Sequence, residues 1–217
     1  MKRIIFFLIV SFSHCLIVHA GNIADVFTSM PDSIFPLLTA KNRSDMVDFY
    51  KNKMEAKVRN RLNSYARMDT LTDDYLRLTL SGASEAEMKL LQTEDSTEII
   101  CLIRSITAPV GDSQIQFFDK DWQRLEWVDV PLPATGEYFG EAVADSVAEE
   151  TKVTLADVQR SIDDLRFVRI ATGPGAPVFT FTLSVDELNR DEKKLARRHL
   201  RTLRYRWTGG RFVNVEQ

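Results

Sequence analysis

The chain has few of the residues that most often carry catalysis or bind metals. Its 217 residues include two cysteines and three histidines, and Cys15, His14 and His19 all fall within the first twenty. Cys101 and His199 are therefore the single cysteine and the single histidine of the rest of the chain. A structural zinc site needs a cluster of such ligands, and a disulfide needs two cysteines. The sequence beyond residue 20 excludes both.

Signatures of nucleophilic hydrolases are also missing. The chain has no G-x-S-x-G element, and His199 has only arginine and leucine as close neighbours in sequence. Acidic residues that could form a carboxylate pair or hold a divalent metal are numerous, namely Glu85, Glu87, Glu94, Asp95, Glu98, Asp112, Asp119 and Asp121. Acidic residues are common in turns and on solvated surfaces for structural reasons. We therefore expect no catalytic, cofactor-binding or metal-binding residues, and a hydrolase that uses carboxylates or a divalent metal is the alternative.

The first twenty residues have the pattern of a secretory signal peptide. Two basic residues precede an apolar run at 4–10, and small or medium residues occupy the positions that a signal peptidase reads before Gly21. The run is interrupted before the roughly 20 apolar residues that span a bilayer, and no later segment reaches that length. A histidine precedes Cys15, where lipid-modified cysteines have a small residue. We expect cleavage between Ala20 and Gly21, and export to the periplasm or the exterior without a lipid anchor.

Alternating apolar residues predict antiparallel strands in the first part of the remaining chain. Leu76, Leu78 and Leu80 alternate with polar residues, the period of a half-buried strand. Residues 99–106 are apolar at successive positions, which predicts a central strand covered on both faces, with Cys101 buried in it as an inert thiol. Other strands are expected at 58–65, 88–91, 114–118 and 122–128, and a helix is expected after an N-cap at Ser44.

Helical spacing returns after the proline-rich segment 131–136. It links Phe139 to Val147, and a second helix begins at Thr154, with Asp157 placed as in a capping box. Strands are then expected at 166–171 and 178–185, with Gly173 to Gly175 as a hairpin connection, and a charged helix at 186–198. A final hairpin of 200–207 and 212–215 turns at Gly209-Gly210.

These patterns predict an α+β fold of antiparallel β-meander sheets with helices packed on one face. We expect a signal peptide at 1–20, an N-terminal α+β half at 21–130 and a C-terminal α+β half at 137–217. Helices followed by strands occur twice, and residues 73–78 and 163–168 are similar in sequence. The two halves are thus expected to be tandem and similar, and a true duplication stays open because antiparallel meanders resemble one another for physical reasons.

Three stretches of the first half carry a resemblance to a known family. They are DVFTSMPDSIFPLLTAKNRSDMVDF at 25–49, LTDDYLRLTLS at 71–81 and DSQIQFFDKDW at 112–122. They resemble an uncharacterised family of exported proteins from Gram-negative gut bacteria, a domain of unknown function. This resemblance implies export and assigns no activity. The tandem architecture also resembles beta-lactamase-inhibitor-type and PepSY-like folds of small periplasmic proteins, which implies no binding residues.

The C-terminal segment is strongly basic. Between residues 190 and 211, nine basic residues are opposed only by Asp191 and Glu192; they are Arg190, Lys193, Lys194, Arg197, Arg198, Arg201, Arg204, Arg206 and Arg211. In the final hairpin, Leu203, Tyr205 and Trp207 are expected to face the core, so Arg204 and Arg206 are left outside. We interpret Arg201, Arg204 and Arg206 as a candidate anion-binding face, and an ordinary solvated surface is the alternative.

Short motifs indicate one modification. Some Gram-negative bacteria attach sugars to exported proteins where Asp precedes Ser or Thr and a small or aliphatic residue or Thr follows. Ser33, Thr70 and Ser96 lie in such motifs, as does Ser146 within an expected helix. We expect O-glycosylation of at least one of Ser33, Thr70 and Ser96.

The sequence thus favours an exported, non-catalytic binding protein of the cell envelope. Its expected partner is an envelope protein or an anionic glycan, since nucleic acid is foreign to that compartment and no transmembrane segment follows the signal. A purely structural subunit of an oligomer is a third hypothesis, which an exposed apolar sheet face would favour.

Overall fold

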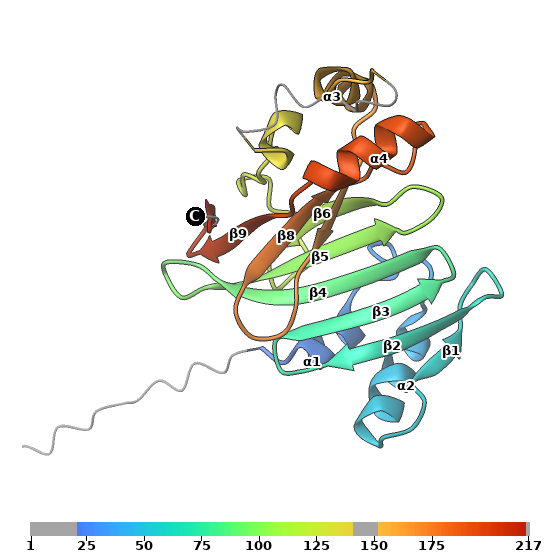
Figure 1. The fold of residues 1–217 in the computed structure, drawn as a ribbon. Helices are drawn as coiled ribbons and strands as arrows, with labels where there is room; N and C mark the ends of the chain where they lie inside the picture. Colours follow the sequence, from blue (N-terminus) through green and yellow to red (C-terminus); the bar gives the residue numbers. More distant parts are fainter. Residues whose placement is uncertain (1–20, 141–151, 216–217) are drawn as a thin grey trace, which may run out of the picture.

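The computed structural model describes residues 21–140 and 152–215 (Figure 1). In these ranges the chain forms four α-helices, one short 3-10 helix and ten strands, and the strands make two antiparallel sheets. The predicted α+β class with antiparallel sheets is confirmed. The predicted residues Val143 and Val147 of the helical pattern lie outside the described ranges.

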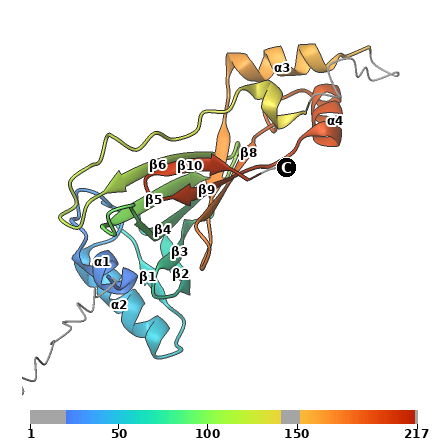
Figure 2. The same cartoon turned by 90° about the vertical axis from the view of Figure 1, so that its left-hand side faces the viewer.

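The larger sheet is a six-stranded meander whose strands are paired in sequence order. Its strands are β1 (Lys57–Arg59), β2 (Tyr65–Leu71), β3 (Tyr75–Ser81), β4 (Ser84–Gln92), β5 (Glu98–Ile106) and β6 (Asp112–Phe118). Two helices, α1 (Ile23–Ser29) and α2 (Ala40–Lys51), cover one face of it (Figure 2). The leucines at alternate positions of β3 point into this apolar cluster, because a strand turns successive side chains to opposite faces.

The smaller sheet covers part of the opposite face. It has four strands in the order β10-β9-β8-β7. These are β7 (Val168–Ala171), β8 (Val178–Leu183), β9 (Leu203–Thr208) and β10 (Arg211–Asn214). The small sheet and three further elements enclose a second apolar cluster, to which β4, β5 and β6 of the large sheet also contribute side chains. The three elements are η1 (Thr135–Tyr138), α3 (Leu155–Asp164) and α4 (Arg190–His199). This cluster contains side chains from both predicted halves of the chain.

Strand β5 takes part in both clusters. Ile100 and Leu102 belong to the cluster under α1 and α2, whereas Ile99, Cys101 and Ile103 belong to the second cluster. The double coverage expected from its continuous apolar run is confirmed. Cys101 is fully buried, and burial raises the pKa of its thiol because the charged thiolate is disfavoured away from water.

The helix starts show where the sequence patterns succeeded and where they were wrong. The Thr154 hydroxyl accepts a hydrogen bond from the Asp157 N–H at 3.1 Å, and the Asp157 carboxylate accepts one from the Thr154 N–H, so the predicted capping box is confirmed. The predicted N-cap at Ser44 is wrong. Helix α2 begins five residues earlier, with Thr39 as its N-cap, because Asn42 completes a capping box there, and Ser44 is an exposed interior residue.

Two predicted strands also differ. The stretch 58–65 is divided by a turn, because the Asn60 side-chain oxygen accepts the N–H groups of Leu62 and Ser64. Residues 122–128 do not continue the meander. Trp122 adopts a left-handed φ of 61° and packs its ring on Phe118. The strand pairing of this stretch is limited to a single β-bridge between Arg124 and Phe118. The predicted strand at 88–91 is part of a longer strand, the second half of β4.

Candidate functional site

The outer face of the small sheet gathers arginine side chains. In β9, Arg204 and Arg206 are exposed and alternate with the buried residues Leu203, Tyr205 and Trp207. The predicted orientation of this strand is confirmed. Residues two apart on a strand are roughly 7 Å apart along one face. Both guanidinium groups therefore lie over the same strip of sheet.

Strand β10 adds a third arginine that the sequence reasoning did not include. Arg211 pairs in register with Thr208, which lies on the same side of β9 as Arg206. Cross-strand partners share a face, so Arg211 joins the other two. The register follows from the tight Gly209-Gly210 turn, at which both glycines have positive φ values of 60° and 137°. Extending the hairpin pairing through this turn would have placed Arg211 from the sequence alone. We call Arg204, Arg206 and Arg211 the arginine face.

The strands that carry the arginine face contain no acidic residue, and Glu94 packs against Gly209 in the turn that precedes Arg211. The four strands β7 to β10 contain no aspartate or glutamate. Thr180 is paired in register with Arg204, and the Thr182 hydroxyl lies 3.2 Å from that of Thr202. Within the described ranges, no ion pair involves Arg204, Arg206 or Arg211. Three cations and several hydroxyl groups are thus available to a ligand.

Arg201, the third residue predicted for the anion-binding face, lies just before β9. Its side-chain Nε donates a hydrogen bond to the Glu137 carbonyl at 2.7 Å, and its backbone N–H donates to the Tyr138 carbonyl at 2.8 Å. These bonds attach the segment before β9 to η1. A contact of Arg201 with an anion stays a prediction.

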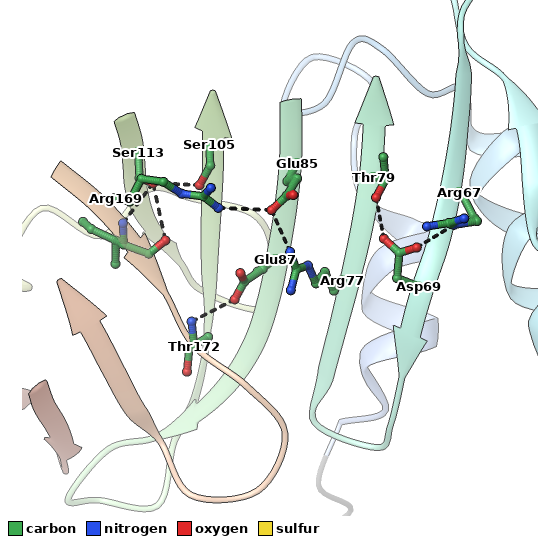
Figure 3. Close-up of polar contacts among 11 residues, drawn as sticks. Arg67, Asp69, Arg77, Thr79, Glu85, Glu87, Ser105, Ser113, Arg169 and Thr172 are labelled. Atoms are coloured by element: carbon green, nitrogen blue, oxygen red, sulfur yellow. Dashed lines mark hydrogen bonds and ion pairs between the residues drawn. The ribbon is translucent and has the colours of Figure 1, made fainter. Parts of the chain in front are cut away.

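A second group of charged residues lies on the second face of the large sheet, beside the hairpin of β7 and β8 (Figure 3). We call Tyr75, Arg77, Glu85, Glu87 and Lys89 the junction cluster. Their side chains share one face because each alternates with a residue that packs beneath α1 and α2. The acidic pair Glu85 and Glu87 is the kind of arrangement that the alternative hypothesis of a hydrolase requires.

The bonds of the junction cluster hold the two sheets together. Glu85 accepts hydrogen bonds from Arg77 at 2.9 Å and from Arg169 of β7 at 3.2 Å. Glu87 is 4% exposed and accepts the backbone N–H of Thr172 at 2.8 Å. Both carboxylates are therefore engaged by the second sheet, as Figure 3 shows.

Lys89 makes the same connection with its ammonium group. Its Nζ donates to the Asp74 carboxylate at 2.8 Å and to the carbonyls of Gly173 and Gly175 at 2.9 and 3.0 Å. An ammonium group has three donors, and all three are used. The hairpin connection that the sequence predicted at these glycines is confirmed, and it is the segment that Lys89 fixes.

Burial raises the pKa of two groups in the junction cluster. It raises the pKa of Glu87, and the Thr172 N–H and Arg77 oppose this only in part. It also raises the pKa of Tyr75, to which the nearby Glu87 charge contributes. Perturbed carboxyl groups occur at catalytic sites, but buried structural networks perturb them as well. Glu87 accepts the Thr172 N–H of the second sheet, so it contributes to the joint between the two sheets.

The residues predicted for signal cleavage and for O-glycosylation lie in separate parts of the chain. Gly21 is the first described residue, and Ala20 and Ser146 lie outside the described ranges. Ser33 is exposed in a turn, and Ser96 is exposed between β4 and β5. Thr70 is half-buried within β2 next to a bulge.

Of the aspartates considered for calcium, Asp119 caps its own turn and Asp112 accepts the Val168 N–H. Across residues 21–140 and 152–215, no cluster of three or more potential metal ligands is present.

Comparison with known proteins assigns the chain to a family. A family model described as a protein of unknown function (DUF3256) matches residues 15–212. The chain belongs to this family. The predicted membership of an uncharacterised family is thus confirmed. A solved structure of a domain of an uncharacterised protein from Porphyromonas gingivalis W83 is similar, with a TM-score of 0.72 and 22% sequence identity. The similarity covers 91% of this chain and 100% of that one. It shows the fold alone, and no curated protein matches.

Proposed function

We propose that this protein is exported to the cell envelope and binds an anionic glycan there through the arginine face. The observation that carries the proposal is the arrangement of Arg204, Arg206 and Arg211. They project from one face of a sheet whose strands contain no acidic residue, and none has a carboxylate partner in the described structure. Uncompensated cations attract anionic partners and orient them on approach.

A glycan suits this face better than a compact anion does. The arginines are spread over two strands and point away from the core, so they present a strip rather than a pocket. Threonine side chains of β8 and β9 lie beside them, and hydroxyl groups exchange hydrogen bonds with sugar hydroxyls. Planar guanidinium groups bind carboxylates with two parallel hydrogen bonds. A polymer of uronic acids would supply carboxylates at repeated intervals.

The proposed compartment rests on the pattern of the first twenty residues. No helix within the described ranges has the length and apolar character needed to cross a membrane. Non-catalytic action is proposed because the acidic pair of the junction cluster is bonded into the protein.

Binding of polygalacturonate to residues 21–217 tests the proposal by isothermal titration calorimetry. The variant Arg204→Gln/Arg206→Gln/Arg211→Gln should weaken binding about 10-fold, since each exposed charge pair contributes about 0.5 kcal/mol. Binding by the natural chain should also weaken as salt is raised, because exposed charges are screened.

The matched control is Arg124→Gln/Arg160→Gln/Arg197→Gln, which removes the same charge from exposed arginines elsewhere. It should leave the affinity within about 2-fold, because these arginines do not lie on the strands of the arginine face and each already has a carboxylate partner. Equal weakening by both triple variants would show attraction to net charge alone and would overturn the proposal. So would a failure of the natural chain to bind.

A further inference from the structure

The edge of the large sheet that β1 forms is strongly basic. Helix α2 packs against β1 there, at the end of the molecule opposite α3 and α4 (Figure 1). From the last residue of α2 to the middle of β2, the chain has six basic residues and one acidic residue, Glu55. All six basic residues are exposed; they are Lys51, Lys53, Lys57, Arg59, Arg61 and Arg67. We call residues 51–67 the basic edge.

The basic edge also exposes three large apolar side chains. Met54 is 60% exposed before β1, and Leu62 is 74% exposed in the turn between β1 and β2. Tyr65 is 53% exposed at the start of β2. Exposed apolar side chains that are gathered in one place and rimmed by polar groups mark surfaces that contact a protein or a membrane.

The strand geometry places cations beside the aromatic ring. Val58 packs into the apolar cluster beneath α1 and α2, so its neighbours Lys57 and Arg59 point to the opposite side of β1. Arg59 is paired in register with Tyr65, and cross-strand partners share a face. The Lys57 ammonium lies 4.7 Å from the centroid of the Tyr65 ring, and the guanidinium carbon of Arg59 lies 5.6 Å from it. The ring is thus flanked by two positive charges.

Three of the six cations have carboxylate partners. The ion pairs are Lys57 with Glu55 at 3.8 Å, Arg61 with Asp32 at 2.6 Å and Arg67 with Asp69 at 2.6 Å. Within residues 21–140 and 152–215, no ion pair involves Lys51, Lys53 or Arg59. Asp48, exposed in the last turn of α2, is one carboxylate against these three cations. The basic edge therefore keeps a positive charge after its ion pairs are counted.

Protection of the sheet edge explains only part of this composition. Edge strands often carry lysine, because charge prevents pairing with another chain. Met54 and Leu62 oppose that role, since exposed apolar side chains favour association. A glycan would neutralise the cations but would leave both aliphatic side chains in water. The surface of an anionic bilayer accepts both kinds of side chain, because it has charged headgroups above an acyl boundary.

We propose that the basic edge docks this protein on the surface of a lipid bilayer that contains anionic phospholipid. The three exposed apolar side chains would enter the boundary between headgroups and acyl chains. The three cations without a carboxylate partner would then lie at the level of the phosphates. Tyrosine is enriched at that depth, and each basic residue close to an anionic leaflet adds to the attraction. This surface is separate from the arginine face, so the proposal does not rest on the proposed function.

Co-sedimentation of residues 21–217 with lipid vesicles tests the contribution of charge. The natural chain should bind vesicles of phosphatidylglycerol and phosphatidylcholine in equal parts, and should bind pure phosphatidylcholine vesicles at least about 10-fold more weakly. The variant Lys51→Gln/Lys53→Gln/Arg59→Gln should weaken binding to the mixed vesicles about 10- to 100-fold. The control Arg124→Gln/Arg160→Gln/Arg197→Gln removes the same charge elsewhere and should stay within about 2-fold of the natural chain.

A second pair of variants tests the contribution of the apolar side chains. Met54→Ser/Leu62→Ser keeps every charge and should weaken binding to the mixed vesicles about 10-fold. Its matched control is Leu132→Ser/Leu165→Ser, at positions 83% and 57% exposed outside the basic edge, which should leave binding unchanged. All four residues are exposed, so both variants should keep the melting temperature of the natural chain.

Four results would overturn the proposal. The first is absence of binding to the mixed vesicles, and the second is equal binding to pure phosphatidylcholine vesicles. The third is equal weakening by a variant of the basic edge and its matched control, which would show attraction to net charge or general apolarity alone. The fourth is unchanged binding of Met54→Ser/Leu62→Ser, which would show that the edge attracts anions without entering a bilayer.

Discussion

Glu87 shows how a charged residue is kept inside this fold. Its carboxylate is almost fully buried, opposite Arg77 in the neighbouring strand, and it accepts the Thr172 N–H of the second sheet. Removing a charge from water costs free energy that such partners offset incompletely, and its pKa is accordingly raised. The folded protein therefore binds a proton at this site more readily than the unfolded chain does.

Replacement of Glu87 by glutamine should have an effect on stability that depends on pH. A group with a raised folded-state pKa contributes its stability fully below the unfolded pKa, and that stability is lost as pH rises through the folded pKa. Glutamine stays neutral, so its contribution to stability does not decrease as pH rises. The free energy of unfolding of Glu87→Gln minus that of the natural chain should increase from about pH 4 to about pH 7. Urea unfolding at both values measures it, and a constant or decreasing difference would contradict the argument.

At the scale of elements, the helix starts depend on local hydrogen bonds that the sequence shows only in part. Thr39 and Ser44 are both acceptable N-cap residues followed by polar residues, and the spacing of apolar residues does not choose between them. In the structure the Thr39 hydroxyl accepts a hydrogen bond from the Asn42 backbone N–H at 3.1 Å, and the Asn42 side-chain oxygen accepts one from the Thr39 N–H. The reciprocal pair decides the start of α2.

Two alanine substitutions should separate the true cap from the apparent one. Thr39→Ala removes the capping hydroxyl and should lower the free energy of unfolding by about 1 kcal/mol. Ser44→Ala replaces an exposed interior residue with a better helix former, and should be neutral or stabilising by up to about 0.5 kcal/mol. Chemical denaturation of both variants makes the comparison. A larger loss for Ser44→Ala would mean that α2 begins later than it does here.

The strands were easier to predict than the cavities that form between elements. A period of two residues identifies β3, β8 and β9, because one face of each is buried and the other is not. The same rule placed Arg204 and Arg206 outside. It did not place Tyr138 and Arg166 in the lining of one cavity, since these residues belong to different segments, which come together only when η1 packs on the sheets. Sites built between elements leave no local pattern.

For the molecule as a whole, the two sheets are held together by a joint of apolar and charged contacts. The continuous apolar run of β5 predicted cover on both faces, but it did not identify what would supply the second cover. The structure supplies it from the C-terminal sheet, with Phe117 of β6 stacked on Trp207 of β9 at 5.9 Å between ring centroids. The charged contacts of Glu85, Glu87 and Lys89 fix the same joint at its edge. Their alternation with apolar residues in β4 was visible in the sequence, but their partners in the second half were not.

The start of the predicted mature chain is also tied to the large sheet. The Gly21 nitrogen donates to the Glu98 carboxylate at 2.9 Å, at the first residue of β5. A side chain at this position would place its first carbon 2.5 Å from an oxygen of that carboxylate, so the Glu98 side chain would have to shift. If the signal is removed before Gly21, this nitrogen becomes the α-ammonium group, and the bond becomes charge-assisted.

Cleavage should therefore strengthen the attachment of the N-terminus, and a double-mutant cycle tests this. Glu98→Gln should cost about 0.5–1 kcal/mol more in a chain that begins at Gly21 than in one that retains a short neutral extension before it. The extension keeps the N–H donor but removes the charge, so the difference isolates the ion pair. Denaturant unfolding of the four proteins gives the coupling energy. Equal costs of Glu98→Gln in both chains would show that the charge of the ammonium group adds nothing to this bond and would contradict the prediction.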